Sequence, residues 1–166
     1  IDLDEGNKYK FRNFTWEGNS LYETDVLDQT LNLKIGDGYS KSIFDEAVYQ
    51  NVQSLYMDRG YLYSSIEPSF TPIGDDSLDV HFSVTENNQV YIRNINIYGN
   101  DKTRENVIRR ELDVFPGDLF RRTLMMRSMQ KLHVLNYFDP TSLSPNVVPV
   151  DEDEIDLDIT LSEKSS

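Results

Sequence analysis

The 166-residue sequence has no cysteine, one tryptophan, and only 16 basic residues against 29 acidic ones. The lack of cysteine excludes thiolate catalysis, iron–sulfur clusters, cysteine-based zinc sites and disulfides, and it is compatible with either the cytosol or the periplasm. The net charge of −13 argues against nucleic acid as a partner, because phosphate binding requires a basic surface. No apolar run is long enough to span a bilayer or to serve as a signal peptide.

Catalytic and cofactor motifs are also missing. The sequence has no glycine-rich phosphate loop, no nucleophile elbow and no HExxH motif, so we expect neither an enzyme nor a cofactor. Asp151-Glu152-Asp153-Glu154 lacks the alternating ligands and central glycine of a calcium loop. A solvated hairpin turn is the favoured interpretation of this run, and a calcium site is the alternative.

The sequence does contain an internal repeat, at an offset of 81 residues, as between Arg12 and Arg93. Nine residues of the first copy recur in the second, and most of them are types that form turns and boundaries. They are Glu5, Asn7, Arg12, Asn13, Gly18, Asn19, Leu31, Gly36 and Asp37, which fall on Glu86, Asn88, Arg93, Asn94, Gly99, Asn100, Leu112, Gly117 and Asp118.

Each copy opens with an alternating segment that predicts a strand, over 9–16 and 90–98, and that ends at Gly-Asn. A short amphipathic helix follows, with Val26, Leu27 and Leu31 on its apolar face in the first copy, and Thr103 is expected to cap its counterpart in the second. A second helix is predicted over about 41–58, and its apolar face carries Phe44, Val48, Val52 and Leu55. The second copy's equivalent carries Phe120, Leu124, Met125, Met129, Leu132 and Leu135, with Met126 exposed.

An extended segment, a polar turn and a final strand, over 78–84 and 155–161, complete each copy. The sequence therefore predicts an α+β chain of two tandem βααββ domains. Each is expected to be a three-stranded mixed sheet that two antiparallel helices cover on one face, with the final strand in the middle.

A tandem βααββ unit with a strand ending in Gly-Asn and a helix ending in Pro-Gly-Asp resembles the POTRA (polypeptide-transport-associated) domain, as it occurs in outer-membrane protein assembly factors. Between Gly117 and Tyr137 the helical segment is five residues shorter than between Gly36 and Tyr61. This difference is similar to that between the penultimate and last POTRA domains of such factors. By this resemblance, residues 1–5 are the end of a preceding truncated POTRA domain, 6–86 the penultimate domain and 87–164 the last one.

The resemblance implies a periplasmic fragment at the outer membrane of a Gram-negative cell, which acts in β-barrel assembly and is not an enzyme. Its partners would be unfolded outer-membrane proteins, accessory assembly lipoproteins, and the chain's own C-terminal membrane barrel, which is absent from this sequence. The alternative is a POTRA pair from a polypeptide-translocating transporter of the two-partner secretion type.

In the predicted topology the second strand of each copy is an edge, and an edge can capture an extended peptide through its main chain. The first copy's edge, 61–67, has one proline near its end, whereas prolines interrupt the second copy's edge, so we expect the first to be the better site. The alternative is that the prolines only protect the edges from aggregation. The candidate strand-addition residues are Tyr61, Tyr63, Ser65, Ile66, Glu67, Thr141 and Leu143.

Basic residues gather in the helical part of the second copy, on an otherwise acidic chain. They predict a surface that faces an acidic partner or lipid headgroups, and the alternative is a solvated helical face whose arginines pair with neighbouring carboxylates. The candidate residues are Arg109, Arg110, Arg121, Arg122 and Arg127.

Overall fold

The computed structural model describes residues 8–165, which form two compact units. The first unit comprises the described residues up to Tyr56 together with Tyr63–Asn87, and the second comprises Met57–Leu62 with the described residues from Asn88 onwards. The expected strand remnant at residues 1–5 lies outside the described residues. None of the helices within 8–165 has the length and hydropathy that a membrane span requires.

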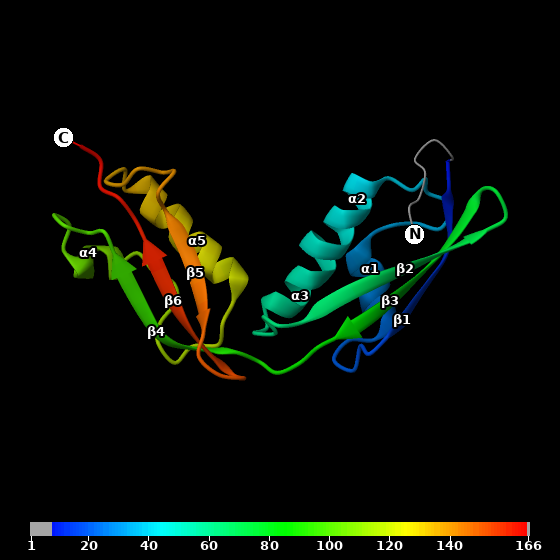
Figure 1. Ribbon diagram of the computed structural model, residues 1–166, viewed down its shortest axis with the longest axis horizontal. Helices are drawn as coiled ribbons and strands as arrows, with labels where there is room; N and C mark the ends of the chain where they lie inside the picture. The colour runs from blue at the N-terminus through cyan, green and yellow to red at the C-terminus, as the bar shows by residue number, and fades with distance from the viewer. Residues whose placement is uncertain (1–7, 166) are drawn as a thin grey trace. The chain divides into compact units, whose positions relative to one another are not determined.

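The first unit contains one three-stranded sheet and two helical segments (Figure 1). The strands are β1 (Lys10–Glu17), β2 (Ser65–Ile73) and β3 (Ser77–Thr85). Between β1 and β2 lie α1 (Thr24–Leu31) and a longer helical segment made of α2 (Lys41–Asp45), the π-helix η1 (Glu46–Val52) and α3 (Gln53–Met57).

The second unit repeats this order with shorter helices (Figure 1). Its elements are β4 (Tyr91–Tyr98), α4 (Glu105–Arg109), α5 (Arg122–Val134), β5 (Ser144–Pro149) and β6 (Glu154–Thr160). The sheet orders are β1-β3-β2 and β4-β6-β5. In both sheets the central strand is parallel to the first strand and antiparallel to the second. The predicted mixed topology and the α+β class are therefore confirmed.

The two units share a topology, but the side chains that fill their cores differ. In the first unit the rings of Phe44 and Phe82 stack with centroids 6.0 Å apart, and Trp16 stacks on Phe82 at 4.1 Å. The second unit's core is mostly aliphatic and includes Ile92, Leu132 and their neighbours on β6. Alternate residues of β3 and β6 are buried, which shows that only one face of each sheet is covered.

The repeated Gly-Asn pair ends the first strand of each unit in the same way. Gly18 has φ +83°, and a Cβ added to it would lie 2.0 Å from the backbone oxygen of Val84. The side-chain Nδ2 of Asn19 then donates to the Tyr22 carbonyl at 2.9 Å, and the side-chain Nδ2 of Asn100 donates to the Thr103 carbonyl at 3.1 Å. Only glycine fits this close approach, which explains why the pair recurs.

Two further repeated residues tie the strands together. Arg12 donates to both carboxylate oxygens of Asp79, at 2.8 and 2.7 Å, and Arg93 does the same to Asp156, at 3.0 and 2.7 Å. Each arginine is the extra residue of a bulge in the first strand, so its side chain bridges the strands where the register shifts. The repeated arginine is therefore a structural feature of the sheet.

The helices correct three expectations. Val26 is 40% exposed, so only Leu27 and Leu31 bury the apolar face of α1. Thr103 does not cap α4, because the N-cap residue is Arg104 and makes no side-chain cap. In the long helical segment Val52 is buried as predicted, but the next buried residue is Tyr56, and Leu55 is only partly buried. Residues four apart drift around an α-helix by about 40° at each step, and the wider π turn of η1 offsets that drift.

Methionines of α5 lie where the pattern places them. Met125 and Met129 pack against the second unit's core, and Met126 is 54% exposed. The predicted face of this helix is confirmed for Leu132, which is fully buried.

Candidate functional site

The edge strand β2 begins later than the sequence pattern indicated. Tyr61 and Tyr63 precede the strand, whereas Ser65, Ile66 and Glu67 are its first three residues. The strand continues to Ile73 and pairs with β3 without a break, from Ser65 opposite Thr85 to Ile73 opposite Ser77. The predicted edge of 61–67 is therefore corrected to Ser65–Ile73.

The prolines of β2 fix which main-chain groups face outward. In an antiparallel ladder alternate residues bond to the neighbouring strand, and the residues between them face away. Pro68 and Pro72 have no N–H to give to β3, so the uninterrupted register assigns the bonds to β3 to the odd-numbered residues. The even-numbered residues face the open edge, and the N–H groups there belong to Ile66 and Phe70.

The second unit's edge strand, β5, follows the same rule with fewer donors. Val150 N–H donates to the Glu154 carbonyl at 3.0 Å, which extends the ladder of even-numbered residues beyond the strand. The outward residues of β5 are therefore Pro145, Val147 and Pro149, and only Val147 carries an N–H.

The two residues predicted for the second unit's edge, Thr141 and Leu143, both precede β5. Thr141 lies in a turn where its hydroxyl and its N–H both donate to Asp139, at 2.7 and 2.9 Å. Leu143 lies immediately before the strand and packs against the core. The open edge of β5 is thus shorter than that of β2 and has one outward donor where β2 has two.

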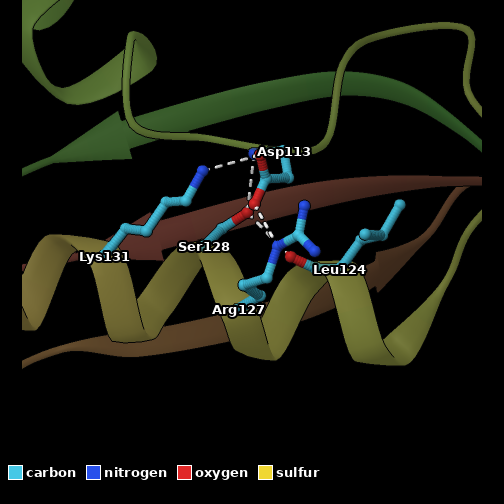
Figure 2. Close-up of polar contacts among 5 residues, drawn as sticks. All are labelled: Asp113, Leu124, Arg127, Ser128 and Lys131. Atoms are coloured by element: carbon cyan, nitrogen blue, oxygen red, sulfur yellow. Dashed lines mark hydrogen bonds and ion pairs between the residues drawn. The ribbon is translucent and has the colours of Figure 1, made fainter.

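Part of the predicted basic surface is neutralised within the unit (Figure 2). Asp113 accepts hydrogen bonds from Arg127 Nε at 2.8 Å and from Lys131 Nζ at 2.9 Å. Ser128 Oγ accepts from the Asp113 N–H at 2.9 Å and donates to the Leu124 carbonyl at 2.8 Å. The hydrogen bonds from Arg127 and then Lys131 hold the pKa of Asp113 below its ordinary value. This cluster ties the 113 loop to α5.

The remaining arginines of the set divide into two kinds. Arg109 is paired with Glu105 at 3.3 Å, as the solvated interpretation expected. Within residues 8–165, Arg110, Arg121 and Arg122 have no carboxylate within ion-pair distance. The five predicted residues therefore do not form one uniform basic face, and three of them keep their charge available.

The acidic run after β5 forms the turn of the β5–β6 hairpin. Asp151, Asp153 and Glu154 bring carboxylate oxygens within 4.8 Å of one another, and all three residues are at least partly exposed. The Asp153 N–H donates to Asp151 Oδ1 at 3.1 Å. Because the Asp151 side chain is engaged in the turn itself, its placement has a structural explanation.

Comparison with known families agrees with this geometry. The family described as POTRA, surface antigen variable number repeat, matches residues 9–87 and 90–164. The chain therefore belongs to the POTRA family, and each unit of the structure is one POTRA repeat.

Within the family, the chain is similar to outer membrane protein assembly factor BamA. It is 27% identical over 169 residues to BamA of Neisseria meningitidis and 29% identical over 172 residues to BamA of Nitratidesulfovibrio vulgaris. These matches cover 100% and 99% of this chain and 21% of each relative. The chain thus spans about a fifth of the length of the curated relatives that it matches.

Two solved structures share the fold. The Haemophilus influenzae BamA POTRA3-5 structure matches with a TM-score of 0.82 and 18% identity, over 93% of this chain and 61% of that one. The structure of BamA from Haemophilus ducreyi lacking POTRA domains 1-3 matches with a TM-score of 0.76 and 19% identity, over 95% of this chain and 29% of that one.

Proposed function

We propose that this chain is the penultimate and last POTRA domains of a BamA-type assembly factor, and that it receives unfolded outer-membrane β-barrel proteins by strand addition in the periplasm. The observation that carries this proposal is the open edge of β2, with its outward N–H groups at Ile66 and Phe70. Main-chain groups recognise any extended segment, because they bond to its backbone and not to its side chains.

The edge of β2 is suited to reversible capture. Its four outward residues all offer a carbonyl, but Pro68 and Pro72 remove every second donor. An added strand would therefore form an incomplete ladder, which limits both affinity and uncontrolled aggregation. The two interpretations of the prolines are then compatible. The edge can still capture a peptide, and its weak binding protects it from aggregation.

The proposed docking surface for accessory lipoproteins consists of Arg110, Arg121 and Arg122. Their guanidinium groups have no internal carboxylate partner within 8–165, so an acidic partner would meet charges that are not already neutralised. Arg127 is excluded from this surface because Asp113 pairs with it.

An NMR titration of the labelled chain with an extended peptide from a barrel strand tests strand addition. We expect amide shifts at Ile66 and Phe70 and a weaker response at Val147. A spectrum without shifts at β2 and β5 at millimolar peptide would refute strand addition.

A gain-of-function variant sharpens this test. Replacing Pro68 by Val adds one outward N–H, and a net hydrogen bond of about 0.5–1.5 kcal/mol tightens peptide binding by about 2- to 10-fold. The matched control is Pro116→Val, the same substitution outside both edge strands. Equal affinity of the Pro68→Val variant and the control would show that the peptide does not use this edge.

The docking surface is tested separately with Arg121→Glu combined with Arg122→Glu. We expect weaker binding of a purified accessory assembly lipoprotein in calorimetry. Lys10→Glu combined with Lys34→Glu makes the same charge change on the first unit and is the control. If both double variants bind equally well, the arginines are a solvated face.

A further inference from the structure

The first strand of each unit is also an edge, and its beginning is closed in both copies. Phe11 N–H donates to the Asp37 carbonyl at 2.9 Å, and Gly36 N–H donates to the Phe11 carbonyl at 2.8 Å. In the second unit Ile92 makes the same two bonds with Asp118 and Gly117, at 2.8 and 2.7 Å. The two units therefore differ only beyond the bulge.

The bulge decides which residues face outward after it. It inserts one extra residue, at Arg12 and Arg93. Before the bulge the main-chain groups of Phe11 face outward, and after it those of Phe14 and Trp16 do. In the second unit the shifted set begins at Ile95, whose carbonyl accepts a bond from outside the sheet. Tyr98, of the opposite parity, bonds inward, because its carbonyl accepts from Leu161 N–H at 3.0 Å.

Arg109 closes this part of the second unit's edge. Its Nη2 donates to the Ile95 carbonyl at 2.7 Å. The same nitrogen also donates to Oε1 of Glu105, one turn earlier on α4, at 3.3 Å. A hydrogen bond from a charged guanidinium is roughly twice as strong as one between neutral groups. An incoming strand would have to displace it to pair with Ile95.

The first unit has the opposite charge at the equivalent position. The residue 81 positions before Arg109 is Asp28, and it accepts from Trp16 Nε1 at 2.7 Å. A carboxylate cannot donate to a carbonyl. Within 8–165, no group outside the sheet bonds to the main chain of Phe14 or Trp16.

We propose that the outer edge of β1 at Phe14 and Trp16 is a second strand-addition site, and that the residue at position 28 or 109 decides whether this edge is open. The occupant is an extended polypeptide segment that carries basic side chains, because the unpaired groups are main-chain groups and α1 has two aspartates and no basic residue. This inference rests on the proposed function, which concerns β2.

The test is a titration of the labelled chain with a decapeptide of alternating valine and lysine. We expect amide shifts at Phe14 and Trp16 and at the β2 edge, a change in Trp16 fluorescence, and no shift at Ile95. Shifts at β2 with none at Phe14 and Trp16 would overturn this inference and leave the proposed function intact. A spectrum silent at both edges would overturn both.

Two variants test the role of these positions: Asp28→Arg is designed to close the β1 edge, and Arg109→Ala is designed to open the β4 edge. Asp28→Arg is expected to reduce the shifts at Phe14 and Trp16 at least fivefold while those at Ile66 remain. Asp25→Arg makes the same charge change on α1 and is the control for charge, and Asp28→Ala is the control for the lost bond from Trp16 Nε1. An effect of Asp28→Arg beyond that of either control isolates the bond to the Phe14 carbonyl. Shifts in Asp28→Arg equal to those in either control would refute the role of position 28.

The reverse variant keeps the proposal testable if Asp28→Arg fails to fold. Arg109→Ala removes the guanidinium from the Ile95 carbonyl, and new peptide-dependent shifts at Ile95 and Ile97 are expected. If the second unit folds and these amides stay silent, Arg109 does not close the edge.

Discussion

Gly18→Ala is predicted to destabilise the first unit far more than Gly36→Ala does. Both glycines have positive φ, +83° and +96°, so an alanine at either position occupies the left-handed region. They differ in surroundings, because a Cβ at Gly18 would lie 2.0 Å from the Val84 oxygen whereas nothing lies within 4 Å of a Cβ at Gly36. The pair therefore separates backbone strain from steric overlap.

The expected costs follow from these two terms. The left-handed conformation costs an L-residue about 1–2 kcal/mol, which is the whole penalty at Gly36. At Gly18 the chain must also move about 1 Å to relieve the overlap, and overpacking of this kind costs a further ~1–3 kcal/mol. We expect a total of about 2–5 kcal/mol for Gly18→Ala.

Urea unfolding followed by fluorescence measures this difference without further labels. The chain has one tryptophan, Trp16, which stacks on Phe82 inside the first unit. The free energy of unfolding from the Trp16 signal should fall in the order wild type, Gly36→Ala, Gly18→Ala. Equal values for the two variants would show that the approach of Gly18 to the Val84 oxygen is not what requires glycine.

Other perturbations test the clusters of both units. Asp79→Asn should destabilise the first unit more at pH 7 than at pH 3. The hydrogen bonds from Arg12 lower the pKa of Asp79, so the stabilisation is complete above the unfolded pKa of about 4 and declines as the pH falls below it. Urea midpoints at the two pH values check this. Leu132→Ala should cost about 2–5 kcal/mol by circular dichroism. Ser128→Ala should cost about 1–3 kcal/mol because it leaves the Asp113 N–H unpaired, and an unchanged midpoint would contradict this.

The sheet topology was predictable because strand signals and prolines constrain it jointly. Alternation marked the strands, and Pro68 and Pro145 are confined to edges because a central strand needs every donor. The repeated Gly-Asn pair marked the ends of β1 and β4 because its geometry tolerates no Cβ.

The boundaries of the strands and the contacts between distant residues were harder to predict from the sequence. The start of β2 depends on pairing with β3, which the local pattern at 61–64 does not encode. The exact four-residue spacing of Phe44, Val48, Val52 and Tyr56 was a signal for the π turn, but Leu55 satisfied the usual 3.6-residue period and obscured it. The bond from Arg109 to the Ile95 carbonyl joins a helix to an edge, and arginine on a helix surface gives no sign of it.

The two units show how one fold is given different edges by few substitutions. Both keep the same bulge, the same glycine turn and the same arginine–aspartate bridge, so the sheets present equivalent main-chain groups. Prolines at alternate positions reduce the donors on β2 and β5, and a single residue on the first helix sets the state of the opposite edge. Because none of these residues belongs to the buried core, edge availability can change between repeats without a change in fold.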